Sequence, residues 1–252
     1  MGVFYEFHGG MMKPSCDSYS IILYGDSISR GVIYDEEKKK YVVTKQSFAS
    51  SLSQTFNCAF YNASSFGNTL IRGLRNLSKD IEKRKPNIVV LEFGGNDCDF
   101  QWDEVAEKPF DKHVPNTNLS TFKEHLLEAL EQLKLWNIFP VFLSLPPLVS
   151  TRYLKWVGNS DSRKMNRILS WLGDVEQISR WQSMYNDAII TIAREANIRW
   201  IDIRKAFLDQ KNFEDYMCVD GIHPNSKGHQ LITDHILGYI KADYSFLLKS
   251  VK

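Results

Sequence analysis

One segment, Ile21-Ile22-Leu23-Tyr24-Gly25-Asp26-Ser27-Ile28-Ser29-Arg30, organises the rest of the chain. Four apolar residues lead directly into a Gly-Asp-Ser turn, which is typical of a buried parallel strand that ends at the carboxyl edge of a sheet. Ligands of open α/β sheets bind outside that edge, so a serine there can present its hydroxyl to a substrate. The same three residues also form ordinary turns, so the functional interpretation depends on the rest of the chain.

Composition excludes several classes of protein. The chain has 252 residues, of which 43% are hydrophobic and 24% charged, as is usual for a globular domain. Its 31 Lys and Arg nearly balance its 30 Asp and Glu, which argues against nucleic acid or an anionic membrane as a partner. The segment 1–20 lacks the pattern of a secretory signal, and the apolar segment 138–149 is too short to span a bilayer.

The four cysteines lie far apart without a CxxC pair, which predicts neither a zinc site nor a disulfide framework. We therefore expect a reduced, cytoplasmic protein that needs no metal and no cofactor.

Strands and helices alternate along the chain, which is typical of βαβ crossovers and a parallel sheet. We predict one domain over residues 20–252, a three-layer α/β/α sandwich around a flavodoxin-like five-stranded parallel sheet. Residues 1–19 are expected to be a flexible or peripheral lead-in, and 148–176 an irregular insertion rich in aromatic residues. The expected strands are 20–24, 57–62, 88–93, 138–145 and 198–203, and the expected helices lie at 47–56, 70–81, 119–133, 178–196 and after Asn225.

The loops after these strands carry residues suited to acyl transfer, which needs a nucleophile, a base and donors for an oxyanion. Ser27 can supply the hydroxyl, and His223 can accept its proton while Asp220 holds the other ring nitrogen. The oxyanion could be met by the backbone N–H groups of Ser27 and Gly67 and by the side-chain amide of Asn96. All these loops open on one edge of a parallel sheet, so the residues are expected to converge.

These segments resemble the ordered sequence blocks of the SGNH, or GDSL-type, hydrolases. The blocks are Gly25-Asp26-Ser27, the lone Gly67, Gly94-Gly95-Asn96-Asp97 and Asp220-Gly221-Ile222-His223-Pro224. The resemblance implies the SGNH hydrolase fold, with Ser27, Gly67, Asn96 and His223 as the four residues that name the family and Asp220 as the third member of a triad. It departs from the usual pattern at Ile28, where leucine is common.

Other interpretations remain for single residues. Asp26 is expected to brace the nucleophile turn, and Asp97 and Asp99 are either solvated or loop-bracing. His223, His229 and His235 suggest a metal, but positions 229 and 235 face different sides of a helix.

Two other classes of protein remain to be weighed. An ordinary α/β-hydrolase would have Gly-x-Ser-x-Gly at the nucleophile, and this chain lacks the second glycine. A non-catalytic binding module with the same shell remains open.

Aromatic residues after the third strand and in the insertion suggest a substrate wall, with Trp102, Trp156 and Trp181 as candidates. Aromatic faces suit a sugar ring or an acyl pocket. We expect a serine esterase that removes short acyl groups, with O-acetylated carbohydrate favoured. The alternative is a hydrolase of lysophospholipids or acyl thioesters.

Overall fold

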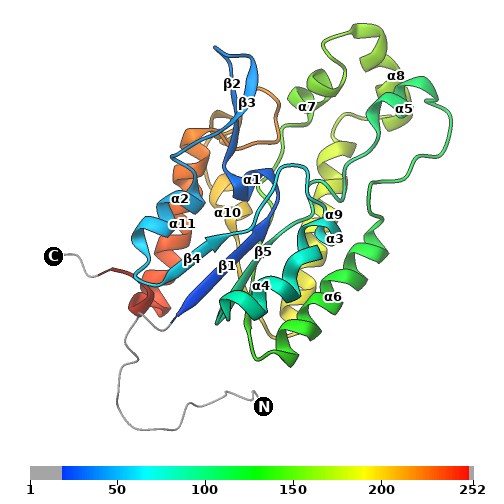
Figure 1. Cartoon of the computed structure of the whole chain (residues 1–252). Coiled ribbons are helices and arrows are strands. Elements are labelled where there is room, and N and C mark those ends of the chain that lie inside the picture. The colour runs from blue at the N-terminus through cyan, green and yellow to red at the C-terminus, as the bar shows by residue number, and fades with distance from the viewer. Residues whose placement is uncertain (1–18, 250–252) are drawn as a thin grey trace, which may run out of the picture.

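The computed structural model describes residues 19–249, so the expected lead-in over residues 1–19 lies almost entirely outside the described residues. A five-stranded parallel sheet with helices on both faces forms the centre of the molecule (Figure 1), which confirms the predicted α/β/α sandwich. The strands follow the order β4-β1-β5-β6-β7 across the sheet. Their bounds are β1 (Ser20–Gly25), β4 (Ala59–Asn62), β5 (Ile88–Glu92), β6 (Phe139–Leu143) and β7 (Arg199–Ile201).

The central strand β1 is buried on both faces of the sheet, which explains its continuous apolar sequence. Ile22 and Tyr24 point into one core, and Ile21 and Leu23 point into the other. β1 pairs with β4 on one side and β5 on the other, and both pairings are parallel. β1, which ends two residues before Ser27, is thus packed on both faces and paired with a strand on both edges.

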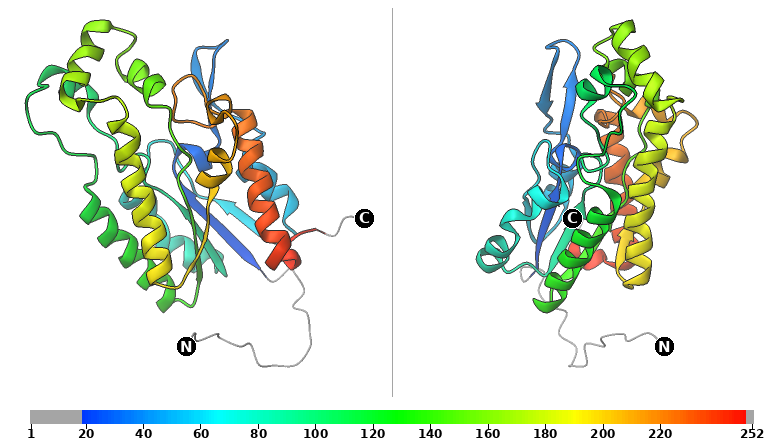
Figure 2. Two further views of the ribbon diagram at one scale, coloured as in Figure 1. Left: turned by 180° about the vertical axis from the view of Figure 1, so that it is seen from behind. Right: turned by 90° about the vertical axis from the view of Figure 1, so that its right-hand side faces the viewer.

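Two layers of helices cover the sheet, as the two views of Figure 2 show. The core of Ile21 and Leu23 packs against α2 (Phe48–Thr55), α10 (Ile203–Leu208) and α11 (Ser226–Asp243). The opposite core packs against α3 (Leu70–Gly73), α4 (Leu77–Arg84), α6 (Leu119–Leu135) and α9 (Gln177–Glu195). Among the described residues, no helix is both long and apolar enough to cross a membrane.

The last helix begins where the sequence predicted it. The Asn225 side chain accepts hydrogen bonds from the backbone N–H groups of Lys227 and Gly228, which confirms Asn225 as the N-cap of α11. Short 3₁₀ helices precede and follow this helix at η3 (Phe213–Tyr216) and η4 (Ser245–Leu247).

The helix expected over residues 70–81 is broken into α3, the 3₁₀ turn η2 (Leu74–Asn76) and α4. Gly73 lies in the first piece, and a β-carbon there would come within 2.4 Å of the Phe93 ring. Glycine is a weak helix former, and here its missing side chain makes room for Phe93. The predicted apolar stripe still faces the core through Leu70, Leu77 and Ile81.

The antiparallel hairpin of β2 (Val32–Asp35) and β3 (Lys40–Val43) was not predicted. It rises above the carboxyl edge of the sheet in Figure 1, beside the short helix α1 (Ser27–Arg30). Its turn carries the charged residues 36–39, which the composition alone marks as an exposed loop.

The expectation that residues 148–176 are irregular is wrong. The segment contains α7 (Ser150–Val157) and α8 (Ser162–Leu172), and α8 packs beside α5 (Trp102–Glu107). Tyr153, Leu154, Ile168 and Leu172 form a buried cluster with α5, so the apolar residues do have helical spacing. Interspersed arginines, serines and half-buried tryptophans obscured that period in the sequence.

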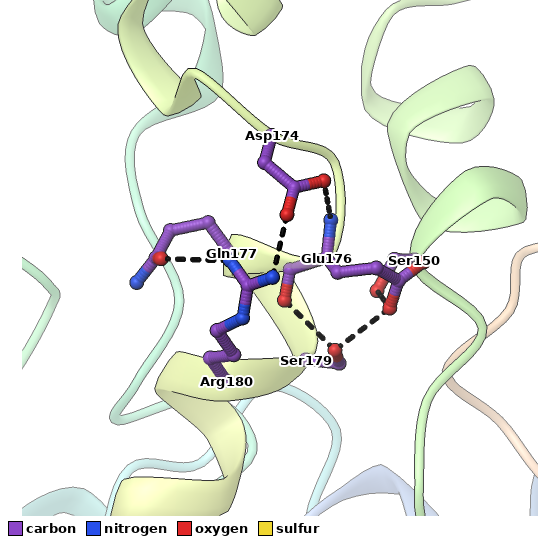
Figure 3. A network of polar contacts seen from close by, with 6 residues as sticks. All are labelled: Ser150, Asp174, Glu176, Gln177, Ser179 and Arg180. Carbon is purple, nitrogen blue, oxygen red and sulfur yellow. Dashed lines mark hydrogen bonds and ion pairs between the residues drawn. The ribbon is translucent and has the colours of Figure 1, made fainter.

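Polar contacts fasten the start of α7 to the start of α9 (Figure 3). The Glu176 carboxylate accepts hydrogen bonds from the Ser150 hydroxyl at 3.0 Å and the Ser179 hydroxyl at 2.9 Å. Arg180 in turn forms an ion pair with Asp174 at 2.5 Å. The segment of α7 and α8 is therefore held at both ends by these polar contacts.

Candidate active site

Ser27, His223 and Asp220 form a continuous hydrogen-bonded chain at the carboxyl end of β1. The Ser27 Oγ lies 2.8 Å from Nε2 of His223, and Nδ1 of His223 lies 2.6 Å from Oδ2 of Asp220. The three side chains are buried, with at most 7% of each residue exposed. Residues 196 positions apart thus meet in the arrangement that the sequence predicted.

The loop before α11 holds Asp220 in place through its own backbone. Oδ1 of Asp220 accepts hydrogen bonds from the backbone N–H groups of Ile222 at 3.0 Å and His223 at 3.1 Å. Burial by itself would raise the pKa of Asp220, but the hydrogen bonds and charge of His223 outweigh it and lower that pKa below its usual value. The carboxylate therefore stays ionised beside the imidazole.

The nucleophile turn requires its glycine and its aspartate. A β-carbon on Gly25 would lie 2.6 Å from the side chain of Ser29 and 2.9 Å from the carbonyl oxygen of Glu92, so no larger residue fits. Oδ1 of Asp26 accepts a hydrogen bond from the backbone N–H of Ile28 at 2.8 Å. Asp26 therefore braces the turn, as predicted.

Asn96 is held at the site by the same aspartate. Its amide Nδ2 donates to Oδ2 of Asp26 and to the carbonyl oxygen of Asn68, both at 3.1 Å. This fixes the amide at the wall of the cavity in front of Ser27. The loop after β5 therefore brings this amide to the cavity, with both of its N–H groups already donated to Asp26 and Asn68.

Asp26 and Glu92 form a buried pair of carboxyl groups behind the nucleophile. Burial raises the pKa of Asp26 to about 6, and burial together with the charge of Asp26 raises the pKa of Glu92 well above its usual value. Ser29 donates a hydrogen bond to Oε2 of Glu92 at 2.7 Å. Two carboxylates cannot both stay charged in such a place, so Glu92 keeps a proton near neutral pH and Asp26 keeps the charge that holds Asn96.

Gly67, one of the predicted oxyanion residues, does not line the cavity in front of Ser27. It lies in the loop after β4 with φ of +71°, a left-handed conformation that favours glycine. Its neighbour Phe66 does reach the site, because the Phe66 ring is nearly parallel to the His223 imidazole at a centroid distance of 6.2 Å. The loop therefore borders the site through Phe66.

A cavity of about 60 Å³ lies in front of Ser27 and His223. Trp102 and Trp181, two of the predicted wall residues, line it, whereas Trp156 does not. Trp156 packs instead against Tyr34 and Tyr41 of the hairpin, at centroid distances of 4.7 and 5.8 Å. The apolar lining consists of Ile28, Phe100, Trp102, Leu148, Tyr153, Ile178, Trp181 and Ile222.

Asp97 is buried, Asp99 is half-buried at the cavity, and both brace loops. Asp97 accepts a hydrogen bond from the backbone N–H of Leu70 at the start of α3, and burial raises its pKa to about 6. Asp99 accepts hydrogen bonds from Nε1 of Trp102 and the hydroxyl of Tyr153, both at 2.7 Å. Asp99 thereby fixes two aromatic residues of the cavity wall.

The histidines do not form a metal site in the described part of the chain. Within residues 19–249, no cluster of three or more His, Cys, Asp or Glu side chains is placed to hold a metal ion. His229 is fully buried and stacks on Phe48 at 6.0 Å. Burial and the proximity of His223 lower the pKa of His229 to about 4, so this imidazole is neutral.

Tyr41 is a residue of the site that the sequence analysis missed. Its hydroxyl donates a hydrogen bond to Oδ2 of Asp220 at 3.0 Å, across 179 positions of sequence. The signal was present, because residues 32–34 and 41–43 are β-branched or aromatic runs around a charged turn, which is typical of a hairpin. Its proximity to Asp220 could not be read from the sequence.

The fold and the aligned serine, histidine and aspartate define a class of α/β protein built for acyl transfer. Within that class the chain belongs to the GDSL-like lipase/acylhydrolase family, whose model matches residues 23–231. This confirms the resemblance found in the sequence and places the chain in a family of ester-bond hydrolases.

Individual relatives are distant. A GDSL esterase/lipase of Arabidopsis thaliana is 23% identical over 161 residues, which cover 62% of this chain and 45% of that protein, so the chain spans about half the length of this relative. The lipase/acylhydrolase from Enterococcus faecalis is 22% identical, has a TM-score of 0.63 and aligns over 93% of this chain and 99% of its own. A catalytic mutant of an acetylxylan esterase from Geobacillus stearothermophilus is 18% identical, with a TM-score of 0.60 and coverage of 93% and 98%. These structural likenesses concern the fold.

Proposed function

We propose that this protein is a serine esterase that hydrolyses short-chain acyl esters, with O-acetyl groups on carbohydrates as the favoured substrates. The observation that carries the proposal is the contact of 2.8 Å between Ser27 Oγ and His223 Nε2 at the mouth of a small, largely apolar cavity. A serine hydroxyl bonded to an imidazole that a carboxylate orients is the arrangement that activates a nucleophile.

In the proposed cycle, Ser27 Oγ attacks the ester carbonyl carbon while Nε2 of His223 takes the hydroxyl proton. The tetrahedral intermediate collapses, the bond to the alcohol oxygen breaks, and His223 donates its proton to that oxygen. Water then repeats the sequence on the acyl-serine and releases the carboxylic acid. The donors proposed for the oxyanion are the backbone N–H of Ser27 and the amide of Asn96, which would exchange its bond to Asp26 or Asn68 for one to the oxyanion. Gly67 is a third donor if its loop moves toward the site.

The size of the cavity supports a short acyl group. A volume of about 60 Å³ is small beside the roughly 300–1,000 Å³ of pockets that enclose drug-sized ligands. We expect an acetyl group to need little rearrangement there, and an octanoyl chain to need displacement of wall residues such as Leu148, Ile178 or Trp181.

Aromatic side chains support a carbohydrate as the alcohol part. Trp102 and Trp181 line the cavity, and Phe66 is 56% exposed beside His223, where the leaving oxygen must receive its proton. Flat apolar rings with polar atoms nearby suit the faces of a sugar. The acetylxylan esterase that shares the fold acts on such an ester, and this likeness agrees with the proposal without extending its substrate to this chain.

The first test is hydrolysis of p-nitrophenyl acetate by the wild type and by Ser27→Ala. We expect release of nitrophenol by the wild type only. Equal rates for the two proteins would refute the esterase and favour a binding module with the same fold.

A second test uses p-nitrophenyl esters from acetyl to octanoyl, followed by release of acetate from acetylated xylooligosaccharides. We expect kcat/KM to be highest for acetyl or propionyl esters and to fall with longer chains. A rate that climbs toward octanoyl would replace the short-acyl proposal by the lysophospholipid or thioester alternative.

A further inference from the structure

The β2–β3 hairpin lies outside the main sheet but contacts the candidate triad directly. Tyr41, on β3, donates its hydroxyl proton to Oδ2 of Asp220 at 3.0 Å, and its ring lies 5.1 Å from the His223 imidazole. Tyr34 lies opposite Tyr41 in the hairpin register, and Trp156 of α7 packs against both rings. The tyrosine is therefore held by a cluster of rings and not by its hydroxyl alone.

The Tyr41 hydroxyl completes the hydrogen bonding of the triad carboxylate. Oδ1 of Asp220 accepts two backbone N–H groups, from Ile222 and His223, while Oδ2 accepts Nδ1–H of His223 and the hydroxyl of Tyr41. A carboxylate has about four acceptor positions, so all of them are occupied. Oδ2, the oxygen that faces the catalytic histidine, has Tyr41 as its second donor.

We propose that Tyr41 is a positioning residue of this esterase, whose hydroxyl fixes the orientation of Asp220 and reduces the negative charge that Oδ2 presents to His223. The proposal rests on the function proposed above. It makes two physical claims. The hydroxyl holds the carboxylate in the plane that the imidazole needs, and it competes with the imidazole for the electrons of one oxygen.

The surroundings of Tyr41 keep it a donor. Burial is the main cause that raises the pKa of its phenol far above the usual value, and the charge of Asp220 adds to it. The titratable groups that face the phenol are Asp220 and His223 of the loop before α11, Cys218 of the same loop and Tyr34 of β2. Cys218 is neutral as well, since burial raises the pKa of its thiol to about 11. The Tyr41 proton is thus retained throughout the pH range in which a histidine base operates.

Tyr41→Phe removes the hydroxyl and keeps the ring contacts, and Tyr34→Phe is the matched control. Tyr34 sits on the neighbouring strand in the same ring cluster, and within residues 19–249 its hydroxyl has no hydrogen bond with Asp220. Both variants remove one oxygen from the same hairpin. Equal melting temperatures for the two would show that the comparison concerns chemistry and not folding.

The readout is the rate of inactivation by diisopropyl fluorophosphate as a function of pH. In this reaction Ser27 Oγ bonds to phosphorus, the phosphorus–fluorine bond breaks, fluoride leaves with the bonding electrons, and the serine proton passes to His223. The rate reports the activated serine whatever the natural substrate is. Hydrolysis of p-nitrophenyl acetate is measured in parallel as the test of the esterase.

We expect Tyr41→Phe to lower the plateau rate of inactivation by about threefold to tenfold, the effect of one lost hydrogen bond. We also expect its acid limb to move to higher pH, because the imidazolium then faces a carboxylate oxygen with one donor fewer. Tyr34→Phe should follow the wild-type curve.

A Tyr41→Phe curve with the wild-type plateau rate and the wild-type acid limb would overturn the proposal. So would a Tyr34→Phe curve with the same displacement, because the effect would then belong to the packing of the hairpin. If the wild type reacts with the fluorophosphate but does not hydrolyse esters, the proposed function is refuted. The positioning role of Tyr41 is then still tested by the pH dependence of inactivation of Tyr41→Phe. A wild type that does not react with the fluorophosphate at all overturns the activated serine, and the role of Tyr41 with it.

Discussion

His229→Leu should remove a large part of the acid sensitivity of folding. His229 is fully buried on α11, where it stacks on Phe48, and burial is the main reason that its pKa falls from 6.5 to about 4. A contact with the backbone of Val32 offsets only part of this effect. Leucine has nearly the volume of the imidazole and suits the apolar surroundings, so the fold should tolerate it.

The change in the free energy of unfolding with pH follows from the pKa of His229, which is 6.5 in the unfolded chain and about 4 in the folded protein. As pH falls below 6.5, the unfolded chain binds a proton at His229 and the folded protein does not, so the wild type loses stability until pH reaches about 4. The fall in the pKa of His229 from 6.5 to about 4 corresponds to about 3 kcal/mol of unfolding free energy. The free energy of unfolding of His229→Leu, relative to that of the wild type, should therefore rise by about 3 kcal/mol between near-neutral pH and pH 4.

Urea unfolding followed by tryptophan fluorescence measures this difference at several pH values. Subtraction of the wild-type curve removes the contributions of Asp26, Glu92 and Asp97, which titrate in both proteins. His235→Leu is the control for replacing a histidine of the same helix, because His235 is half-buried and lies outside the core. A flat curve for His229→Leu would refute the claim that the fold holds this imidazole neutral.

Three further predictions concern the site. Glu92→Gln should keep most of the activity, because Glu92 is already protonated beside Asp26. The free energy of unfolding of this variant, relative to the wild type, should rise with pH, because only the wild type must give up that proton. An activity loss as large as that of Ser27→Ala would contradict the protonated carboxyl. Gly25→Ala should cost about 1–3 kcal/mol in urea unfolding, because its β-carbon would meet Ser29, and an unchanged midpoint would show that the turn can shift. Trp181→Leu enlarges the cavity and should raise kcat/KM for butyryl relative to acetyl esters; an unchanged ratio would place the acyl group elsewhere.

The sequence predicted the sheet well because each central strand is buried on both faces. Such strands read as apolar runs, and β1, β5 and β6 were located within about two residues of their bounds. The approach of Ser27, Asp220 and His223 to one another follows from the topology, since every loop involved opens on the same edge. The distances of 2.6 and 2.8 Å between them required the structure.

Contacts between elements of different layers could not be predicted in the same way. Tyr41 reaches Asp220 from a hairpin outside the sheet, and nothing in the spacing of the chain indicates that approach. Gly67 was expected at the oxyanion site but does not line the cavity, because a motif does not specify the conformation of its loop. Trp156 was expected in the substrate wall, but its ring packs against Tyr34 of the hairpin. An aromatic residue in the sequence does not by itself show whether it lines the cavity or packs against another element.

The triad joins the first strand of the sheet to the loop before its last helix, and this has a consequence for biosynthesis. A ribosome that has made β1, β4, β5 and β6 has made most of the sheet, but His223 and Asp220 are still to be added. With the proposed mechanism the serine could not be activated on that nascent chain, so hydrolytic competence would arise late, once the loop before α11 is in place. Premature release would yield an inert fragment with an exposed sheet face, which favours aggregation over stray hydrolysis.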